Sequence, residues 1–446
     1  MTEQHTTAAR TGPVVIVGFV ALTIPFIETF QPEDSVVYVE EPDVARKRDA
    51  QAKLAGVGFA RGLVEWEYHR PGTADEFHAA HPDLDPVAIV PAVEYAVPFA
   101  ARLAERYGLP GASLGAALIL RDKAVLRRVS AAAGIANPAS VRAESAEDVR
   151  EFLRAHPGPA VLKPANRQAS VGVRVLAGPD EAEAAWAECV VQDEGVFVPD
   201  RPMEVAMLVE QFVRGEEFSV EMLVRGGQPL FTNVTGKHLY PGPYPVESAH
   251  VVPADIPAEL SRLLGAQTAR LMAAVGFGDG VVHCEWIVSG GVPYLVECAG
   301  RMAGDAILDL IEAAYPVEFM RAYFAVLKGE QPPELPARAK SGAAVRFLAP
   351  GAGTVQAVHG VEDAERAEGV VFANCAIAPG TSFGGLRNSW DRTGIVFARA
   401  DTPAEAHRRA DAAAALVRFE MRPPGGEPDG APGSGTDGDP GSDPAA

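Results

Sequence analysis

The chain has 446 residues, of which 48% are hydrophobic and 22% charged, and at roughly 100 to 200 residues per domain this is typical of a soluble globular protein with two to four domains. Its formal net charge of −20 argues against a nucleic-acid partner, because an acidic surface repels phosphate backbones, but it allows a small anion held by a few buried bases. The four cysteines form no CxxC pair, which argues against a zinc finger or a disulfide framework and favours a reduced, cytoplasmic location.

The first apolar segment, residues 14–27, superficially resembles a signal peptide. It is too short to span a bilayer, Pro25 interrupts it, and no A-x-A-like cleavage site follows it. We therefore interpret residues 14–18 as a buried first strand. No other run of 18 apolar residues occurs in the sequence, so no membrane partner is predicted.

Residues 13–118 alternate short apolar strands with helical segments. Strands are predicted at 14–17, 35–39 and 88–90, and the clearest helix at 95–107, where Gly108 provides a C-terminal stop. Short apolar strands separated by helices predict a parallel sheet with helices on its faces. We therefore expect an N-terminal α/β domain.

The rest of the chain divides into four segments. Residues 119–205 are predicted to form a helical linker and a small lid, in which Ser145 and Asp148 have capping-box-like spacing at a helix start. Residues 206–335 are richer in strands, and residues 336–421 form a small C-terminal unit with a helix from Thr402 to about Val417. After Arg422 the chain contains five acids and no base, and we expect residues 422–446 to be a disordered acidic tail. The strands expected in the second and third segments are 160–163, 171–176, 207–212, 218–224, 280–288 and 292–297.

Two glutamates interrupt consecutive apolar strands, Glu285 in the first and Glu297 in the second. If a three-residue loop at 290–292 joins the strands, the two glutamates stand opposite each other with Cβ atoms roughly 4.5–5.5 Å apart. Carboxylates that close repel unless a cation lies between them, and Mg²⁺ binds one or two carboxylates together with phosphate oxygens. The alternative is another register in which both glutamates face solvent. His283 is expected to pack beside Glu285.

Lysine is scarce in this chain, with 7 lysines against 32 arginines. Each lysine is therefore retained although the composition of the chain strongly favours arginine. Lys163 ends an apolar strand and precedes a loop of small residues whose backbone could approach phosphate. Lysine is a compact charge that suits phosphate oxygens, although a lone lysine at a strand end is more often a surface residue. Lys123 and Lys237 are further candidates.

Residues 210–213 form a strand that runs into a turn before Glu217. The backbone of such a strand could read an adenine edge, and the carboxylate of Glu217 could accept hydrogen bonds from ribose hydroxyls. An ordinary half-buried strand is the alternative.

Three more residues could act on a substrate. Arg301 follows Glu297 by four residues in a glycine-rich segment, and it could hold a carboxylate or an oxyanion, or form a salt bridge to either metal-site glutamate. Glu247 and His250 are three residues apart and could relay a proton or bind an amine, or be structural.

In their order along the chain, these residues resemble the ATP-grasp superfamily over roughly residues 13–421. The resemblance is most specific at residues 163–172, which are similar to the L-amino-acid ligase (dipeptide synthetase) branch, and residues 246–253 and 296–305 agree with that branch. It implies an α/β fold, α+β in parts, with ATP-grasp architecture: an N-terminal doubly wound α/β domain, a small lid, a large antiparallel-sheet ATP domain and a small C-terminal α/β unit.

The resemblance also implies a role for each residue. Glu285 and Glu297 would bind Mg²⁺, with Mn²⁺ as an alternative ion, and Arg301 would hold the acyl phosphate, with Glu247 and His250 near the substrate amine. Many superfamily members carry Asn two residues after the second metal glutamate, where this chain has Ala299, so one or two metal ions are compatible with the sequence. ATP would be bound by Lys123, Lys163, Ser170, Glu210, Gln211, Phe212, Val213, Glu217 and Lys237.

The sequence therefore predicts an ATP-dependent carboxylate–amine ligase that forms an amide or peptide bond through an acyl phosphate and releases ADP and phosphate. The expected partners are a small carboxylate and a small amine, one or both of them amino acids, and a homodimer is compatible with the resemblance. A carboxylate–thiol ligase or a biotin-type carboxylase would use the same ATP half-site, although no Cys/His-rich bicarbonate motif is present. The remaining alternative is a non-catalytic nucleotide-binding protein, against which the complete set of Glu285, Glu297 and Arg301 argues.

Overall fold

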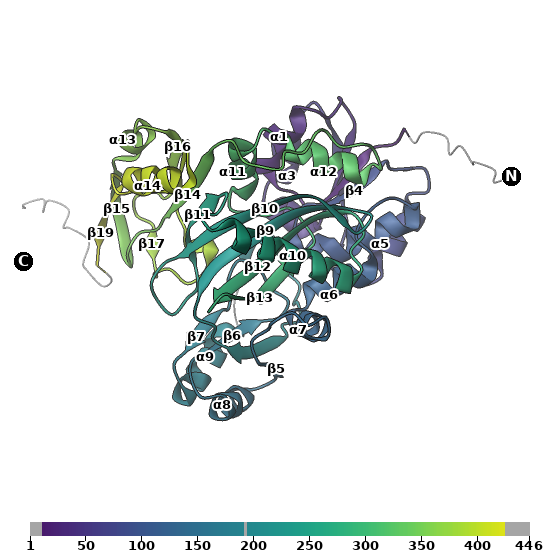
Figure 1. The fold of residues 1–446 in the computed structure, drawn as a ribbon. Coiled ribbons are helices and arrows are strands. Elements are labelled where there is room, and N and C mark those ends of the chain that lie inside the picture. The colour runs from purple at the N-terminus through teal and green to yellow at the C-terminus, as the bar shows by residue number, and fades with distance from the viewer. Residues whose placement is uncertain (1–10, 191–193, 424–446) are drawn as a thin grey trace, which may run out of the picture.

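The computed structural model describes residues 11–190 and 194–423, which form four sheets and the helices around them (Figure 1). The tail predicted from sequence lies, from residue 424 on, outside the described residues. No helix of the described part combines the length and apolarity needed to cross a membrane.

The N-terminal sheet is parallel, as predicted, with the order β3 (Ala60–Glu65), β2 (Val36–Glu40), β1 (Val14–Val17) and β4 (Ala88–Pro91). All four residues of β1 are buried, so the start of the first apolar segment is a core strand, as predicted, while its second half is helical. Strand order reverses direction beside β1, and ligands of such sheets bind at the carboxyl ends of the strands at this point. The helices of this part are α1 (Ile24–Glu28), α2 (Pro42–Lys47), α3 (Ala50–Leu54), α4 (Thr73–Ala80) and α5 (Val97–Tyr107).

The large sheet has eight antiparallel strands. Neighbouring residues of its strands point into different cores: Leu223 packs with α11 (Ile307–Ala314) and α12 (Phe319–Leu327), whereas Met222 packs with α10 (Ala258–Val275). The sheet is continuous across residue 335, where the sequence had suggested a separate unit. Its order is β13 (Val292–Ala299), β12 (Gly280–Ser289), β9 (Glu216–Arg225), β10 (Gln228–Leu239), β11 (Glu247–Val252), β14 (Gly342–Leu348), β18 (Gly394–Ala400) and β16 (Val370–Cys375).

A small antiparallel sheet lies below the large one in Figure 1, with α8 (Ala146–Ala155) and α9 (Ala182–Cys189) beside it. Its order is β5 (Ser140–Ala143), β8 (Met207–Gln211), β6 (Ala160–Pro164) and β7 (Arg174–Leu176). The Ser145 and Asp148 side chains form the predicted capping box of α8. Strand β8 belongs to this sheet and not to the strand-rich segment in which the sequence had placed it, because it pairs with β5 and β6.

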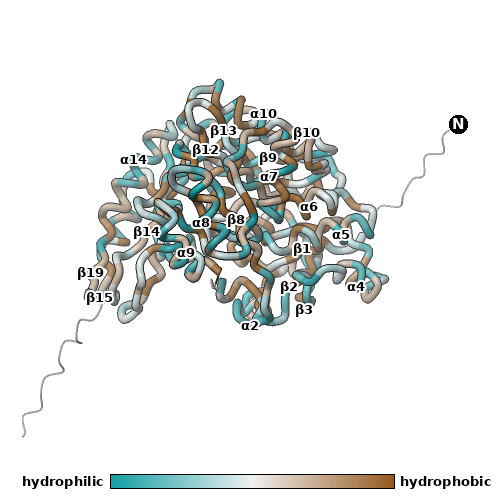
Figure 2. The backbone as a smooth tube through the Cα atoms, turned by 90° about the horizontal axis from the view of Figure 1, so that it is seen from below, coloured by the Kyte–Doolittle hydropathy of each residue, from teal (hydrophilic) through white to brown (hydrophobic). Residues whose placement is uncertain are grey.

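The C-terminal part adds a third antiparallel sheet, β17 (Ser382–Phe383), β15 (Gly353–His359) and β19 (Arg418–Arg422), with α13 (Val361–Glu365) and α14 (Pro403–Ala414). Thr402 caps α14 as predicted, but the helix ends before Val417. Two helices, α6 (Leu114–Arg121) and α7 (Lys123–Ala132), connect the N-terminal part to the small sheet. In Figure 2 the tube is hydrophilic around α2 and β3 at the lower edge, and its hydrophobic stretches lie mainly further inside.

Candidate functional site

One cavity of about 810 Å³ opens where the small sheet, the large sheet and the carboxyl ends of the N-terminal strands meet. This volume lies within the range of roughly 300–1,000 Å³ that is usual for small-molecule sites. All fourteen residues that the sequence analysis assigned to binding or catalysis line it. The structure therefore gathers them in one place, while their individual roles stay predictions.

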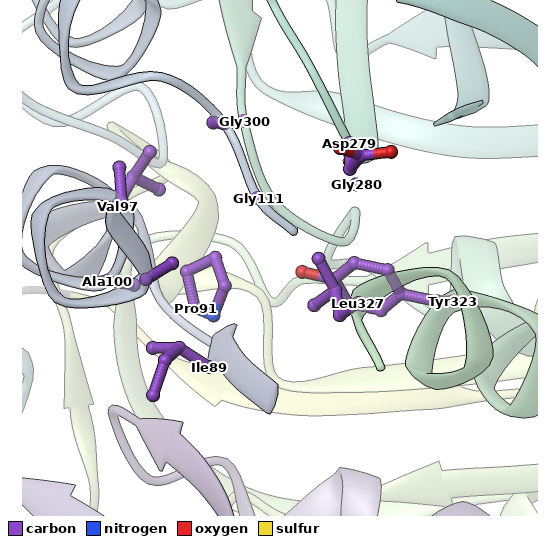
Figure 3. Close-up of a pocket in the computed structure, with 13 residues that line it drawn as sticks. Ile89, Pro91, Val97, Ala100, Gly111, Asp279, Gly280, Gly300, Tyr323 and Leu327 are labelled. Atoms are coloured by element: carbon purple, nitrogen blue, oxygen red, sulfur yellow. The ribbon is translucent and has the colours of Figure 1, made fainter. Parts of the chain in front are cut away.

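A second cavity, of about 20 Å³, lies between α5, β4 and α12 (Figure 3). Apolar side chains such as Ile89, Val97 and Leu327 line it, with Asp279 and several glycines at its edge. Its volume suffices for about one water molecule. It is a packing defect between two parts of the chain and too small for a substrate.

The two glutamates of the β12–β13 hairpin stand opposite each other, as predicted. The connection differs from the expected three-residue loop, since Ser289 pairs with Val292 across a two-residue turn at Gly290 and Gly291. A bulge between Glu285 and Trp286 then shifts the register by one residue and restores the pairing of Glu285 with Glu297. Such bulges often re-aim side chains next to active sites.

Lysines offset the charge of both glutamates. The Nζ atom of Lys237 lies 2.8 Å from Glu285 Oε1, and Nζ of Lys123 lies 2.8 Å from Glu297 Oε2. Burial favours the protonated form of Glu285, but Lys237 and His283 outweigh it and hold the pKa of this carboxyl below its usual range. Two close carboxylates are thus compatible with a folded protein before any metal binds.

A buried network supports Glu285 from behind. His283 contacts Glu285 Oε1 through Nε2 at 3.1 Å, as expected from its position, and Glu221 Oε1 through Nδ1 at 2.9 Å. Ser219, Asn233 and Thr235 donate hydrogen bonds of 2.6–2.7 Å to Glu221. Burial favours a neutral ring, yet the hydrogen bonds that the ring donates to both carboxylates raise the pKa of His283 to about 9.

The donor set fits Mg²⁺ better than a metal held by protein alone. Within residues 11–190 and 194–423, no group of three or more His, Cys, Asp or Glu side chains is arranged to hold a metal ion. Two paired carboxylate residues without a third match an ion that completes its coordination with phosphate oxygens and water.

The small sheet contributes the remaining bases of this end of the cavity. Lys163 on β6 forms an ion pair with Glu210 on β8, and Arg127 donates to the same carboxylate at 3.0 Å. Lys123 donates to the Arg167 carbonyl at 2.8 Å, and Ser170 Oγ donates to the Pro245 carbonyl at 3.0 Å. The loop after β6 is thereby tied to α7 and to the segment that precedes β11.

Residues 211–213 and Glu217 lie on the same wall of the cavity. The N–H groups of Gln211 and Phe212 donate to the carbonyls of Ala139 and Pro159. Burial raises the pKa of Glu217 to about 7, against the opposing charge of Lys237. The carboxyl group of Glu217 can therefore exchange a proton near neutral pH.

Arg301 turns away from the metal-site glutamates. Its Nε lies 2.9 Å from Oε2 of Glu94, a buried residue just after β4, and Arg121 donates to Oε1 of Glu94 at 2.8 Å. The salt bridge to Glu285 or Glu297 considered in the sequence analysis is therefore absent from the ion pairs of the described residues. The sequence analysis missed Glu94, although an acidic residue directly after a buried strand was the available signal.

Glu247 and His250 both line the cavity because β11 also carries a bulge: Lys237 pairs with His250, while Leu239 pairs with Glu247. Residues three apart in a regular strand would point to opposite sides. Glu247 Oε1 lies 3.2 Å from Lys237 Nζ, and Ser389 Oγ donates to Glu247 Oε2 at 3.0 Å.

His250 is held by an acid–base pair that the sequence analysis did not identify. Its Nε2 lies 3.4 Å from Asp305 Oδ2, and Arg392 binds both oxygens of Asp305. Arg392 also lies with its guanidinium 3.9 Å from the ring centroid of Phe347. The C-terminal unit thus supplies a charged group to the cavity, beside His250.

Comparisons with known proteins agree with this architecture. Residues 156–309 match the ATP-grasp domain family, and residues 346–422 match the family described as L-amino acid ligase C-terminal domain 2. The structure resembles the crystal structure of L-amino acid ligase from Bacillus licheniformis, with a TM-score of 0.75 and 17% identity, over 93% of this chain and 100% of that one.

Two curated relatives are each 24% identical to the chain. Dapdiamide A synthase from Enterobacter agglomerans matches over 64% of this chain and 68% of its own length. Alanine–anticapsin ligase from Bacillus subtilis matches over 53% of this chain and 52% of its own. The family resemblance and the fold class predicted from the sequence are confirmed by these matches and by the structural likeness.

Proposed function

We propose that this chain, which carries an ATP-grasp domain followed by an L-amino acid ligase C-terminal domain, is an ATP-dependent carboxylate–amine ligase. The observation that carries the proposal is one cavity with two kinds of charged wall. Paired glutamates and buried lysines form one end, and arginines paired with acids form the other.

The reaction proceeds in two steps. An oxygen of the substrate carboxylate attacks the γ-phosphorus of ATP, ADP leaves, and an acyl phosphate forms. The nitrogen of the amine then attacks the carbonyl carbon, phosphate leaves with the bonding electrons, and the nitrogen loses a proton. Phosphorylation is required because a carboxylate itself is a poor electrophile.

Lys123, Lys163 and Lys237 bind phosphate oxygens, because a compact ammonium suits a spherical distribution of acceptors. Glu285 and Glu297 are placed to hold Mg²⁺, which would neutralise charge on the transferred phosphoryl group. Ala299 offers no side-chain ligand for a second ion. A titration of the enzyme with Mg²⁺ distinguishes one bound ion from two.

Arg301 stabilises the acyl phosphate and the tetrahedral adduct with its planar guanidinium, which Glu94 orients. Glu247 and His250 bind the amine and accept its proton. The small sheet with α8 and α9 closes over the nucleotide and excludes water, which would otherwise hydrolyse the acyl phosphate.

The test is a screen of amino-acid pairs for ATP-dependent phosphate release, followed by mass spectrometry of the product. Thiols and bicarbonate in place of the amine test a thiol ligase and a biotin-type carboxylase in the same assay. Phosphate release with amines and formation of an amide support the proposal. Absence of ATP turnover with every acceptor would contradict it and favour a nucleotide-binding protein.

We also propose that the enzyme is cytoplasmic, since none of the four cysteines is paired in a disulfide. It includes small-molecule substrates and neither a nucleic acid nor a membrane as partner. A homodimer is tested by sedimentation of the purified protein.

A further inference from the structure

The cations of the large cavity differ in how their charge is balanced. Seven of the eight lysines and arginines that line it have a carboxylate of the chain within 4 Å. The eighth, Arg48, forms no such ion pair among the residues that the structure describes. Glu40 acts on Arg48 from beyond this distance, so its charge is only partly balanced, and a half-buried guanidinium in this state is costly unless a ligand supplies more negative charge.

The surroundings of Arg48 leave most of its donors unused. It follows α2 and donates one hydrogen bond, to the Phe19 carbonyl. The nearby Glu40 is occupied by other donors, the N–H groups of Phe19 and Glu41 at 2.7 and 2.8 Å and the Tyr68 hydroxyl at 2.8 Å. Since an arginine has five N–H donors, the guanidinium keeps donors for a ligand in the cavity.

An aromatic wall stands beside Arg48. Its guanidinium carbon lies 5.0 Å from the ring centroid of Phe197, which stacks on Trp390 at 3.9 Å with an interplanar angle of 12°. Trp390 follows Ser389, which donates to Glu247. The wall therefore runs from Arg48 to the residues proposed to bind the amine.

The segment that carries Phe197 is fixed to the N-terminal part of the chain. Arg201 binds both oxygens of the fully buried Glu41 at 2.7 and 2.8 Å, and Lys47 donates to the Val198 carbonyl at 2.9 Å. These contacts hold Phe197 over Arg48 before a substrate arrives, which lowers the ordering cost of binding.

Arg48 is also close to the reacting groups. Phe19, its hydrogen-bond partner, comes just after β1, and Glu94, the partner of Arg301, comes just after β4. These strands are neighbours in the parallel sheet, and neighbouring strands lie about 4.8 Å apart. The partners of Arg48 and Arg301 thus lie at the ends of adjacent strands, and both arginines line one cavity.

An amino acid that acts as the amine substrate keeps its own carboxylate through the reaction. We infer that Arg48 binds this free carboxylate, with Phe197 and Trp390 enclosing the rest of the molecule. The inference rests on the proposed ligase function. It adds that the amine substrate carries a negative charge, on its free carboxylate. It predicts that the enzyme discriminates against amine substrates whose carboxylate has been neutralised.

The experiment compares an acceptor amino acid with its amide, which has the same amine and side chain but no charge. Wild-type enzyme should show a lower KM for the amino acid. Arg48→Gln should raise that KM about 10- to 100-fold, the usual effect of losing a charged hydrogen bond, and leave the KM of the amide unchanged. Arg48→Lys keeps the charge and should recover part of the preference.

One further measurement and one control variant test whether the effect is specific to binding of the amine substrate. Hydroxylamine trapping of the acyl phosphate should proceed at the wild-type rate in Arg48→Gln, because the first step does not involve the amine. Arg46→Gln is the matched control, since Arg46 is an exposed residue of α2 two positions before Arg48, and among the described residues it pairs with Asp43 and donates to the Pro42 carbonyl.

An equal rise of KM for amino acid and amide in Arg48→Gln would overturn the inference and assign Arg48 to balancing Glu40. If Arg48→Gln fails to fold, the same comparison in Arg48→Lys decides between the two. A wild-type enzyme that forms no hydroxamate and no ADP with any substrate pair would instead contradict the proposed ligase function itself.

Discussion

The proposed phosphate end and the proposed substrate end of the cavity are lined by different bases. At the phosphate end, Lys123, Lys163 and Lys237 pair with glutamates, and all three are buried. At the substrate end, Arg301 and Arg392 pair with Glu94 and Asp305. Lysine presents a compact charge, whereas the planar fork of arginine matches a carboxylate, so the choice of base indicates the anion expected at each end.

Two buried histidines have pKa values that are shifted in opposite directions. His283 lies between Glu221 and Glu285, which overcome burial and raise its pKa to about 9. His69 packs against Tyr68 and Tyr95 and is not among the residues that line the cavity; burial, and to a lesser extent the charges of Arg201 and other arginines, lowers its pKa to about 3. The carboxylates around His283 therefore favour a cation, whereas the shift of His69 is caused mainly by burial.

The largest effect should follow from breaking the phosphate end. Glu297→Gln should reduce ligation by about 10³-fold or more, since a metal ion contributes several kcal/mol of charge stabilisation in the transition state. The fold should stay intact, because the pair with Lys123 is partly solvent-exposed on the glutamate side and contributes little. Ligation rate against Mg²⁺ concentration and a thermal melt measure both. The control is Glu216→Gln, because Glu216 is an exposed residue on β9. If Glu297→Gln ligates at the wild-type rate at saturating Mg²⁺, Glu297 is not a metal ligand.

Breaking the substrate end should slow the chemistry and spare the nucleotide. Arg301→Ala should lower kcat about 10²- to 10³-fold, the usual loss for one preorganised charged donor, with nearly unchanged ATP affinity. Arg301→Lys keeps the charge but loses the fork and should recover only part of the rate. Calorimetry with ATP measures the ATP affinity, and steady-state kinetics measure kcat. Loss of ATP affinity with normal turnover at saturating ATP would instead place Arg301 in the nucleotide site.

The phosphate end should also become rigid when ATP binds, and the substrate end much less. At an ATP concentration 100 times its Kd, opening of the loop around residues 160–175 should be disfavoured by about 2.7 kcal/mol if opening requires release of ATP. Hydrogen exchange with and without ATP measures this, with peptides of α14 as an internal reference. Equal exchange of the loop in both conditions would argue against its closing over the phosphates.

Much of the phosphate end could be predicted from sequence because its signals are local. The scarcity of lysine singled out the three that proved buried, and alternating apolar residues located the strands that carry Glu285 and Glu297. The register was right although the loop was wrong, because the shorter turn and the bulge between Glu285 and Trp286 compensate. A bulge leaves no clear mark in one sequence.

The substrate end could not be predicted in the same way. Glu94 and Arg301, like Asp305 and Arg392, are joined only by the packing of distant segments. An arginine among 32 has no compositional signal, so Arg48 and Arg392 were invisible until the fold placed them in the cavity. The placement of β8 in the small sheet was missed for the same reason, since its partners precede it by dozens of residues.

The smallest effect is a test of the two histidines through pH. His69 is neutral in the folded protein down to about pH 3 but binds a proton near pH 6.5 when unfolded, so its contribution to stability is lost as the pH falls below 6.5. His283 behaves in the opposite way: its folded pKa of about 9 adds stability that is complete below pH 6.5 and is lost as the pH rises through 9. Each histidine should contribute roughly 2 kcal/mol to the change in unfolding free energy, between pH 6.5 and 5 for His69 and between pH 6.5 and 8.5 for His283.

Urea unfolding of the wild type, His69→Gln and His283→Gln at pH 5, 6.5 and 8.5 separates the two contributions, because other titrating groups such as Glu217 are common to all three proteins. His69→Gln should flatten only the acid side of the stability profile, and His283→Gln only the alkaline side. Nitrogen NMR of the imidazoles gives a direct check, with His283 charged at pH 7.5 and His69 neutral at pH 5. If both variants flatten the same side, or if His69 is protonated at pH 5, the two histidines do not have pKa values shifted in opposite directions, and this prediction is wrong.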